Sequence, residues 1–183
     1  IRVTDLNQGP VYGIITDEMQ NNEKLYSIFN YDDIFGTVLN RFMVQAITGY
    51  PLTVYGKGGQ TRGYLNIKDT IACVDLAASN PVDKGKYRIF NQVVETFTVN
   101  ELAEKVQRVG NQLGLNVKIN SIKNPRREAE EHYYNPTYTG LKELGLRPHL
   151  LTDDVLSEML EIVSKYKDHI KAETILPKVL WTI

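Results

Sequence analysis

Short stretches with the two-residue periodicity of strands alternate along this chain with longer stretches of helical periodicity. Residues 1–6 alternate apolar and polar positions and include β-branched side chains, a pattern typical of a strand. Asn-Gln-Gly-Pro at residues 7–10 is expected to end that strand. Further short strands are predicted at residues 52–55, 64–67, 87–91 and 117–122.

Apolar residues recur at helical spacing over residues 32–48, which predicts the first long helix. Asp32 and Asp33 lie where a helix N-terminus favours negative charge, and Gly49 follows the last apolar position. Further helices are predicted at residues 69–78 and 141–144. Another is expected to begin at an N-cap at Asn100 and to bury an apolar stripe of Leu102, Val106, Val109 and Leu113. A last helix is predicted after a cap at Thr152.

This order of elements predicts an α/β fold, because strands alternate with helices along the chain. Short strands within the mostly helical second part indicate a small α+β subdomain attached to a parallel sheet. The chain begins at Ile1, without Met and directly in a strand. We therefore expect most neighbours of that strand to lie upstream, in a segment that this chain lacks.

The composition allows a folded core and argues against two kinds of partner. Of the 183 residues, 42% are hydrophobic and 23% are charged, so the chain can bury a core. The 21 basic and 22 acidic residues give a net charge of −1, which provides no general field for attracting nucleic acid. No apolar run reaches the roughly 20 residues that a membrane span needs, so no membrane partner is expected.

The cysteine and the histidines suggest no metal chemistry. Cys73 is the single cysteine and has apolar neighbours, which favours a buried structural thiol over a reactive one. His132, His149 and His169 lie far apart in the sequence and have no cysteine partners. No spacing typical of metal ligands appears, so no metal site is expected.

The glycine-rich loop at residues 56–63 is the first candidate site. Backbone N–H groups can approach a phosphate where side chains are absent, and Arg62 adds a charged donor. The loop matches neither standard phosphate-binding fingerprint, because position 61 is Thr where the dinucleotide motif needs Gly. An ordinary hairpin loop is therefore the alternative to a phosphate cradle.

Two other polar groups are candidates for contacts with a charged ligand. Arg126, Arg127 and Glu128 could grip a diphosphate with an arginine fork and accept hydrogen bonds from ribose hydroxyls. A solvated charged loop is the alternative for these three residues. Asn7 and Gln8 follow the first strand, and ligands of open α/β sheets bind at the carboxyl ends of strands.

Two patterns resemble acid–base sites. Tyr64 and Lys68 have the Tyr-x-x-x-Lys spacing, which serves catalysis when a helical turn brings the side chains together. This segment alternates like a strand, where positions four apart are about 13 Å apart, so we reject the catalytic interpretation. Residues 128–134 carry carboxylates and His132, but a charged turn with packing aromatic residues explains them equally well.

The order and spacing of residues 5–13, 35–42 and 52–64 resemble the second half of extended short-chain dehydrogenases/reductases. That family includes nucleotide-sugar epimerases and dehydratases. Residues 124–135 and the ending that includes Trp181 resemble one narrower branch of it. The resemblance covers essentially the whole chain. It implies the C-terminal part of a Rossmann-type doubly wound sheet, with a small α+β substrate-binding subdomain and without the N-terminal NAD-binding part.

The resemblance implies an NAD-dependent enzyme that acts on UDP-glucose. In such enzymes a tightly held NAD oxidises C4 of the sugar, and acidity at C5 then permits loss of the 6-hydroxyl. In the narrower branch, sulfite adds to the resulting alkene and forms a C–S bond before the hydride returns. The alternatives are a nucleotide-sugar 4-epimerase or 4,6-dehydratase, or a non-catalytic nucleotide-sugar-binding module.

The resemblance also assigns residues. The NAD motif and the catalytic residues of the family precede Ile1, so this chain is expected to hold no catalytic residue. Asn7 and Gln8 match the stretch that faces nicotinamide and sugar. The remaining matches are to the uracil, ribose and diphosphate contacts of the family: Val38, Leu39, Asn40, Arg41, Thr53, Val54, Tyr55, Arg62, Arg126, Arg127 and Glu128.

The same resemblance makes three expectations beyond the site. It places Asn40 and Arg41 near the start of a helix, later than the apolar stripe alone predicts. The expected partners are UDP-glucose, sulfite, the missing N-terminal half and a second copy in a homodimer. A cytoplasmic location is expected, or the plastid stroma in a plant.

Overall fold

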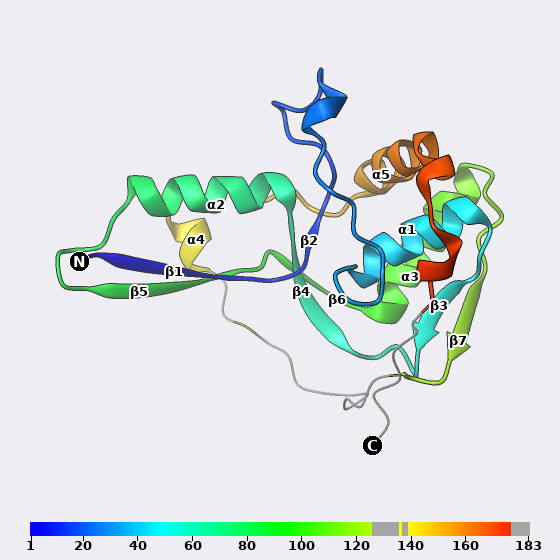
Figure 1. The fold of residues 1–183 in the computed structure, drawn as a ribbon. Helices are drawn as coiled ribbons and strands as arrows, with labels where there is room; N and C mark the ends of the chain where they lie inside the picture. Colours follow the sequence, from blue (N-terminus) through cyan, green and yellow to red (C-terminus); the bar gives the residue numbers. More distant parts are fainter. Residues whose placement is uncertain (126–135, 137–138, 177–183) are drawn as a thin grey trace. The chain divides into compact units, whose positions relative to one another are not determined.

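The computed structural model describes residues 1–125, 136 and 139–176 of the chain. The chain forms two compact units, and Figure 1 names the elements. Unit 1 comprises Ile1–Ser27, Arg62–Thr96 and Tyr134–Leu150, and unit 2 comprises Ile28–Thr61, Phe97–Tyr133 and Leu151–Ile183.

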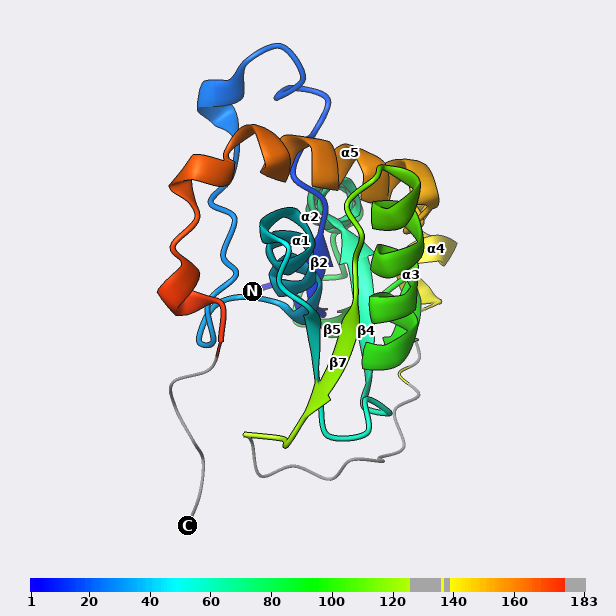
Figure 2. The same cartoon turned by 90° about the vertical axis from the view of Figure 1, so that its right-hand side faces the viewer.

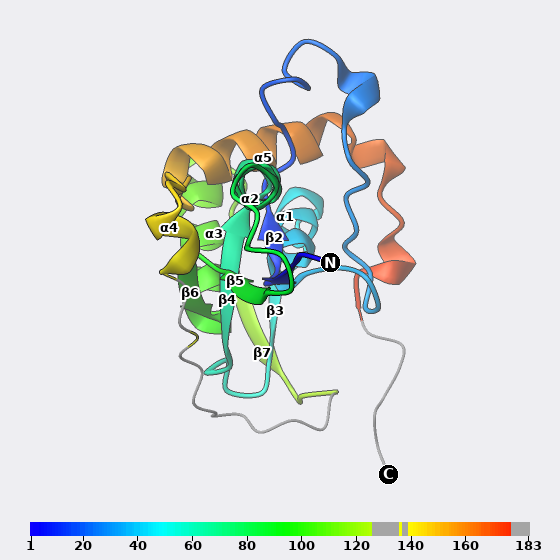
Figure 3. The same ribbon diagram turned by 90° about the vertical axis from the view of Figure 1, so that its left-hand side faces the viewer.

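Parallel strand pairs and one long helix build unit 1. Its elements are β1 (Val3–Gln8), β2 (Val11–Tyr12), η1 (Glu23–Leu25), β4 (Thr61–Asn66), α2 (Ile67–Ser79), β5 (Tyr87–Gln92), β6 (Glu95–Thr98) and α4 (Gly140–Glu143), with β4 and β6 each crossing a unit boundary. β1 pairs in parallel with β5, and β4 lies between β2 and β6. α2 runs along β1, and α4 lies against β5 (Figure 1; Figure 3 views α2 along its axis).

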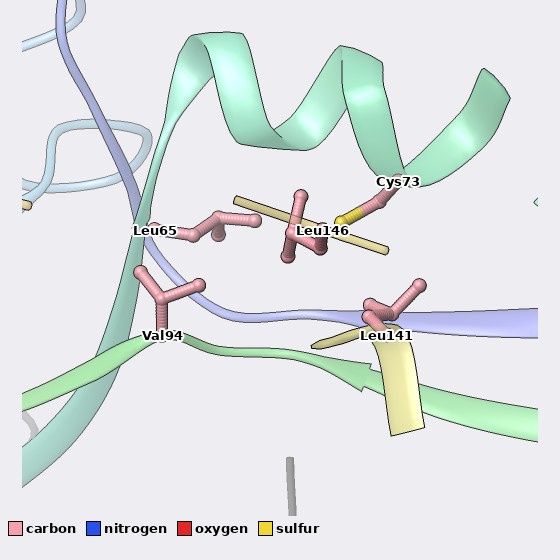
Figure 4. Close-up of a cluster of buried hydrophobic side chains, with 5 residues drawn as sticks. All are labelled: Leu65, Cys73, Val94, Leu141 and Leu146. Atoms are coloured by element: carbon pink, nitrogen blue, oxygen red, sulfur yellow. The ribbon is translucent and has the colours of Figure 1, made fainter. Parts of the chain in front are cut away.

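The core of unit 1 forms where α2 and α4 meet the strands. Leu65, Cys73, Val94, Leu141 and Leu146 converge there from five separate places in the sequence (Figure 4). Burying each leucine side chain contributes roughly 1.5–3 kcal/mol. Burial also raises the pKa of the Cys73 thiol. The predicted burial of Cys73 is therefore confirmed.

Three helices around one parallel strand pair build unit 2. Its elements are α1 (Val38–Thr48), β3 (Leu52–Tyr55), α3 (Val99–Gln112), β7 (Ile119–Ile122), α5 (Asp153–Lys165), η2 (Lys167–His169) and η3 (Ala172–Thr174). β3 pairs in parallel with β7, and α1, α3 and α5 pack against one another (Figure 2). Phe42, Leu102 and Leu156 contribute one fully buried side chain from each helix. The predicted α/β class is confirmed.

α1 begins at Val38, so the prediction of a helix from Asp32 was wrong and the later start implied by the resemblance is confirmed. Asp32 forms a separate turn, because its Oδ1 accepts hydrogen bonds from Ile34 N at 2.8 Å and Phe35 N at 2.9 Å. The Thr37 hydroxyl caps α1 instead, accepting from Asn40 N at 3.2 Å. At the other end Gly49 adopts φ 75° and ends the helix as predicted.

The cap of α3 is Thr98, so the prediction of Asn100 was wrong. The Thr98 hydroxyl accepts from Glu101 N, and the Glu101 side chain accepts from Thr98 N, which completes a capping box. Leu113 is 42% exposed at the end of α3, so it does not belong to the buried stripe. The cap of α5 at Thr152 is confirmed.

Two strand boundaries also differ from the prediction. β1 continues through Asn7 and Gln8 and pairs with β5 along its whole length, so the predicted break at Asn7 was wrong. β4 begins at Thr61, and Ile67 already belongs to α2. The loop before β4 is not a hairpin, because β3 pairs with β7 while β4 pairs elsewhere.

No helix that the structure describes is long and apolar enough to cross a membrane. Within the same described ranges, no group of three or more His, Cys, Asp and Glu side chains is placed to hold a metal ion.

Candidate functional site

Side chains of α1 hydrogen-bond one edge of β3 in unit 2. Gln45 Oε1 accepts from Thr53 N at 3.0 Å, and an Arg41 terminal nitrogen donates to Thr53 O at 3.0 Å. Gln45 Nε2 also donates to the Thr53 hydroxyl at 2.7 Å. Because β7 pairs with the other edge, these two side chains take the place of a second neighbouring strand. They fix the end of β3 relative to the start of α1.

Arg41 is a buried cation held against aromatic rings. Its side chain is 7% exposed, and its guanidinium carbon lies 4.1 Å from the centre of the Tyr55 ring. The centre of the Phe42 ring lies 5.6 Å from the same guanidinium carbon. Stacking of this kind fixes the plane of an arginine and suits it to directed hydrogen bonds with phosphate. The resemblance matched Arg41 and Tyr55 to the same ligand, and the fold brings them into contact.

The glycine-rich loop after β3 is held by the first turn of α3. Gly56 and Gly58 have φ of 62° and 72°, which favour glycine. Asn100 donates from its backbone N to Gly58 O at 3.1 Å and from its side chain to Lys57 O at 2.8 Å. A Cβ on Gly58 would overlap the Asn100 side chain. The loop is therefore anchored, and its last residue before β4, Gln60, is 3% exposed.

The other matched residues of α1 and β3 differ in accessibility. Leu39 and Val54 are buried in the core of unit 2. Val38 is partly exposed in the first turn of α1. Asn40 Nδ2 donates to Asn30 O at 2.9 Å and ties the preceding segment to the helix.

Asn7 and Gln8 lie exposed at the carboxyl end of β1 in unit 1. The parallel register places them opposite Asn91 and Gln92 of β5, and Asn7 Nδ2 donates to Asn91 Oδ1 at 3.4 Å. An exposed amide, Asn7, and a half-buried amide, Asn91, therefore meet at the strand ends, where ligands of parallel sheets bind. The sequence analysis missed Asn91, because only the register places it beside Asn7.

Two further predictions concern residues of different parts of the chain. Arg62 lies half-buried in β4 and belongs to unit 1, whereas Arg41 belongs to unit 2. Arg126, Arg127 and Glu128 lie outside the described residues. The arrangement of several arginines around one diphosphate therefore stays a prediction.

The structure supports the rejection of Tyr64 and Lys68 as a catalytic pair. Tyr64 is a buried residue of β4, whereas Lys68 lies in the first turn of α2. The two side chains are not one turn apart on a helix. Lys68 Nζ instead pairs with Asp17 Oδ1 at 2.6 Å and lowers the pKa of that carboxyl.

A polar network that the sequence did not indicate holds His149 in unit 1. The fully buried Asp69 accepts from His149 N at 2.9 Å, and its other oxygen lies 2.6 Å from His149 Nδ1. The Tyr12 hydroxyl lies 2.7 Å from His149 O and 2.8 Å from Glu95 Oε2. Burial raises the pKa of Tyr12 far above its ordinary value, so the hydroxyl stays protonated. These contacts attach the segment around His149 to the N-terminus of α2.

The fold of this chain matches part of the fold of solved nucleotide-sugar epimerases. The UDP-glucose 4-epimerase of Thermotoga maritima, solved with UDP-glucose, matches 91% of this chain with a TM-score of 0.67 and 20% identity. A UDP-N-acetylglucosamine 4-epimerase from Methanobrevibacter ruminantium matches 90% with a TM-score of 0.65 and 17% identity. In both cases the match covers 47% of the solved chain. These likenesses establish the architecture.

The sequence is similar to UDP-sulfoquinovose synthases of two organisms. It is 56% identical over 181 residues to the chloroplastic enzyme of Spinacia oleracea and 46% identical over 183 residues to that of Sulfolobus acidocaldarius. Each match covers 99% of this chain, which spans 38% and 46% of the length of these two relatives. No family model matches the chain. The predicted resemblance to the narrower branch is confirmed.

Proposed function

We propose that this chain is the nucleotide-sugar-binding half of an NAD-dependent UDP-sulfoquinovose synthase. The observation that carries the proposal is the identity of 56% and 46% with a plant and an archaeal synthase across 99% of the chain. Relatives from such distant organisms that match nearly the whole of this chain support the proposal of a shared activity. The complete protein would convert UDP-glucose and sulfite to UDP-sulfoquinovose.

The geometry of unit 2 supports a role in binding the nucleotide. Arg41 presents a fixed guanidinium beside the Tyr55 ring, and the anchored loop leads directly from Tyr55 to Arg62. Arginine is suited to a diphosphate because its planar fork donates two parallel hydrogen bonds. By the resemblance, Arg126 and Glu128 add contacts to the diphosphate and ribose.

The amides at the ends of β1 and β5 fit a nicotinamide ring. Asn7 and Asn91 offer paired donors and acceptors that complement a carboxamide, at the sheet edge where dinucleotides bind. Bound NAD would supply the oxidation of the sugar at C4 and the later return of the hydride. In this proposal Asn7 and Gln8 orient nicotinamide and sugar, while the acid–base residues belong to the N-terminal half.

The partners of the complete protein follow from the same proposal. They are UDP-glucose, sulfite and a second copy of the protein in a homodimer. The protein would act in the cytoplasm, or in the plastid stroma of a plant; the name of the Spinacia oleracea relative describes that enzyme as chloroplastic.

Product formation by the full-length protein tests the proposal. Incubation with UDP-glucose and NAD is expected to yield UDP-sulfoquinovose only when sulfite is added, as detected by mass spectrometry. Sulfite-independent turnover to UDP-galactose would indicate a 4-epimerase, and a 4-keto-6-deoxy product would indicate a 4,6-dehydratase. Binding of UDP-glucose without any turnover would indicate a non-catalytic module. Each of these three results would contradict the synthase.

A further inference from the structure

Gln60 carries a buried hydrogen-bonding atom that none of the described residues pairs. The residue is 3% exposed, between the anchored glycine loop and β4. Its Nε2 donates to Tyr55 O at 3.4 Å, whereas its Oε1 has no hydrogen-bond partner among the described residues. A buried acceptor left in this state costs roughly 1–3 kcal/mol. A buried acceptor without a partner is uncommon in folded proteins, and a hydrogen bond to a ligand would explain it.

The orientation of the Gln60 amide follows from its neighbour. Turning the amide over would place Oε1 against the carbonyl oxygen of Tyr55, and two acceptors repel each other. The donor must therefore face Tyr55, and the free group must be the acceptor. Gln45 provides the contrast in the same unit, because both ends of its fully buried amide are paired with Thr53.

We propose that Gln60 is a specificity-determining residue whose Oε1 accepts a hydrogen bond from the uridine part of the nucleotide sugar. The inference rests on the proposed function and names one contact within that site. The diphosphate carries no donor at neutral pH, so it does not complement this atom. Uridine offers three donors, which are the imide N–H of uracil and the two ribose hydroxyls.

The neighbourhood of Gln60 favours uridine over the hexose. Gln60 Nε2 donates to the backbone oxygen of Tyr55, and the Tyr55 ring stacks on the guanidinium of Arg41. A site built from an aromatic ring and a guanidinium plane suits a flat base better than a saturated sugar ring. A buried acceptor in such a site also rejects ligands that lack the matching donor, because the acceptor then stays unpaired.

Removing the unpaired oxygen of Gln60 should affect the stability of the free protein and its affinity for the ligand in opposite directions. Gln60→Met keeps the length of the side chain and removes the unpaired oxygen, so the unliganded protein should melt at the same or a higher temperature. The same change should weaken binding of UDP about tenfold, since one hydrogen bond to the ligand is lost. Gln45→Met is the control: it leaves Thr53 N–H without its partner, so the melting temperature should fall.

Calorimetric titration of the full-length protein with UDP tests the proposal, using wild type, Gln60→Met and Gln45→Met. A second measurement needs no substitution: N3-methyl-UDP, 2′-deoxy-UDP and 3′-deoxy-UDP each lack one donor. One of the three should bind wild type about tenfold more weakly than UDP does, and bind Gln60→Met as UDP does. Which analogue loses affinity identifies the donor.

Three results would overturn the assignment of Gln60. The first is an unchanged affinity of Gln60→Met for UDP, and the second is equal binding of wild type to UDP and all three analogues. The third is an effect seen with UDP-glucose but absent with UDP, which would place the contact on the hexose. Failure of wild type to bind UDP or UDP-glucose at all would instead overturn the proposed function, and the inference with it.

Discussion

Arg41 and Arg62 are held in different ways, which bears on their roles. Arg41 is buried, stacked on Tyr55 and bonded to Thr53 O, so it contributes to the fold as well as to a ligand site. Arg62 lies half-buried on β4. Replacing Arg41 would therefore change stability and binding together. Arg62 is the better residue for testing the diphosphate contact.

We predict that Arg62→Ala weakens binding of UDP-glucose to the full-length protein by roughly 2–4 kcal/mol, because a buried diphosphate would lose a charged partner. Lys165→Ala is the control, since Lys165 is an exposed cation at the end of α5, which carries none of the matched residues. It should change the binding free energy by less than about 0.5 kcal/mol. Isothermal titration calorimetry measures both, and equal affinities of Arg62→Ala and wild type would refute the contact.

At the scale of elements, the loop between β3 and β4 depends on α3 for its shape. Asn100, in the first turn of α3, bonds to both Lys57 and Gly58. This use of Asn100 explains why Thr98 caps the helix although both residue types are good caps. Apolar periodicity correctly located the buried stripe at Leu102, Val106 and Val109. It could not decide between two capping residues, because that choice depends on a contact with a distant loop.

Alanine substitutions at two glycines with similar positive φ angles distinguish the cost of backbone strain from the cost of a packing clash. Gly49 has φ 75° and no atom within 4 Å of an added Cβ, whereas a Cβ on Gly58 (φ 72°) would meet Val54 Cγ1 at 2.6 Å. Gly49→Ala should lower the free energy of unfolding by about 1–2 kcal/mol through backbone strain alone. Gly58→Ala should lower it clearly more, as measured by denaturant unfolding. Equal losses would show that α3 does not hold the loop tightly.

At the scale of the whole molecule, unit 1 exposes an apolar surface on β1, β5 and α2. Val3 is 40% exposed, Ile71 50%, Val74 55% and Ile89 51%. A groove of about 340 Å³ in the same unit is lined by Arg2, Thr4, Leu6, Val74, Ala77, Ala78, Pro81 and Val82. The chain spans less than half the length of its synthase relatives, so we expect the remainder of the protein to cover this surface.

The isolated chain of residues 1–183 is therefore predicted to self-associate. The exposed apolar side chains, and the edge of β1 that no described strand covers, can bury themselves against another copy. Light scattering after size-exclusion chromatography should show large or heterogeneous particles, whereas the full-length protein should show a single species. A stable monomer of the isolated chain at micromolar concentration would contradict this expectation.

The sequence and the fold contribute different parts of the account. The order of short motifs from Asp5 to Tyr64 identified the architecture, because motif spacing is a property of the chain. Pairings across the sheet cannot be read from motif spacing in the same way. Asn91 stands beside Asn7, and Asp69 beside His149, only because the chain folds back over 80 or more positions. Gln60 could not be singled out from the sequence, since an unpaired atom is defined by its surroundings.

Amide hydrogen exchange of the full-length protein tests most directly whether this half binds the nucleotide. Addition of UDP-glucose should slow exchange in peptides that cover residues 38–41 and 52–62, because the ligand would order and shield α1 and the loop after β3. Peptides of α2, which belongs to unit 1 and carries none of the matched residues, serve as the internal reference and should be unaffected. Protection confined to segments outside this chain, with residues 38–41 and 52–62 unchanged, would contradict the account.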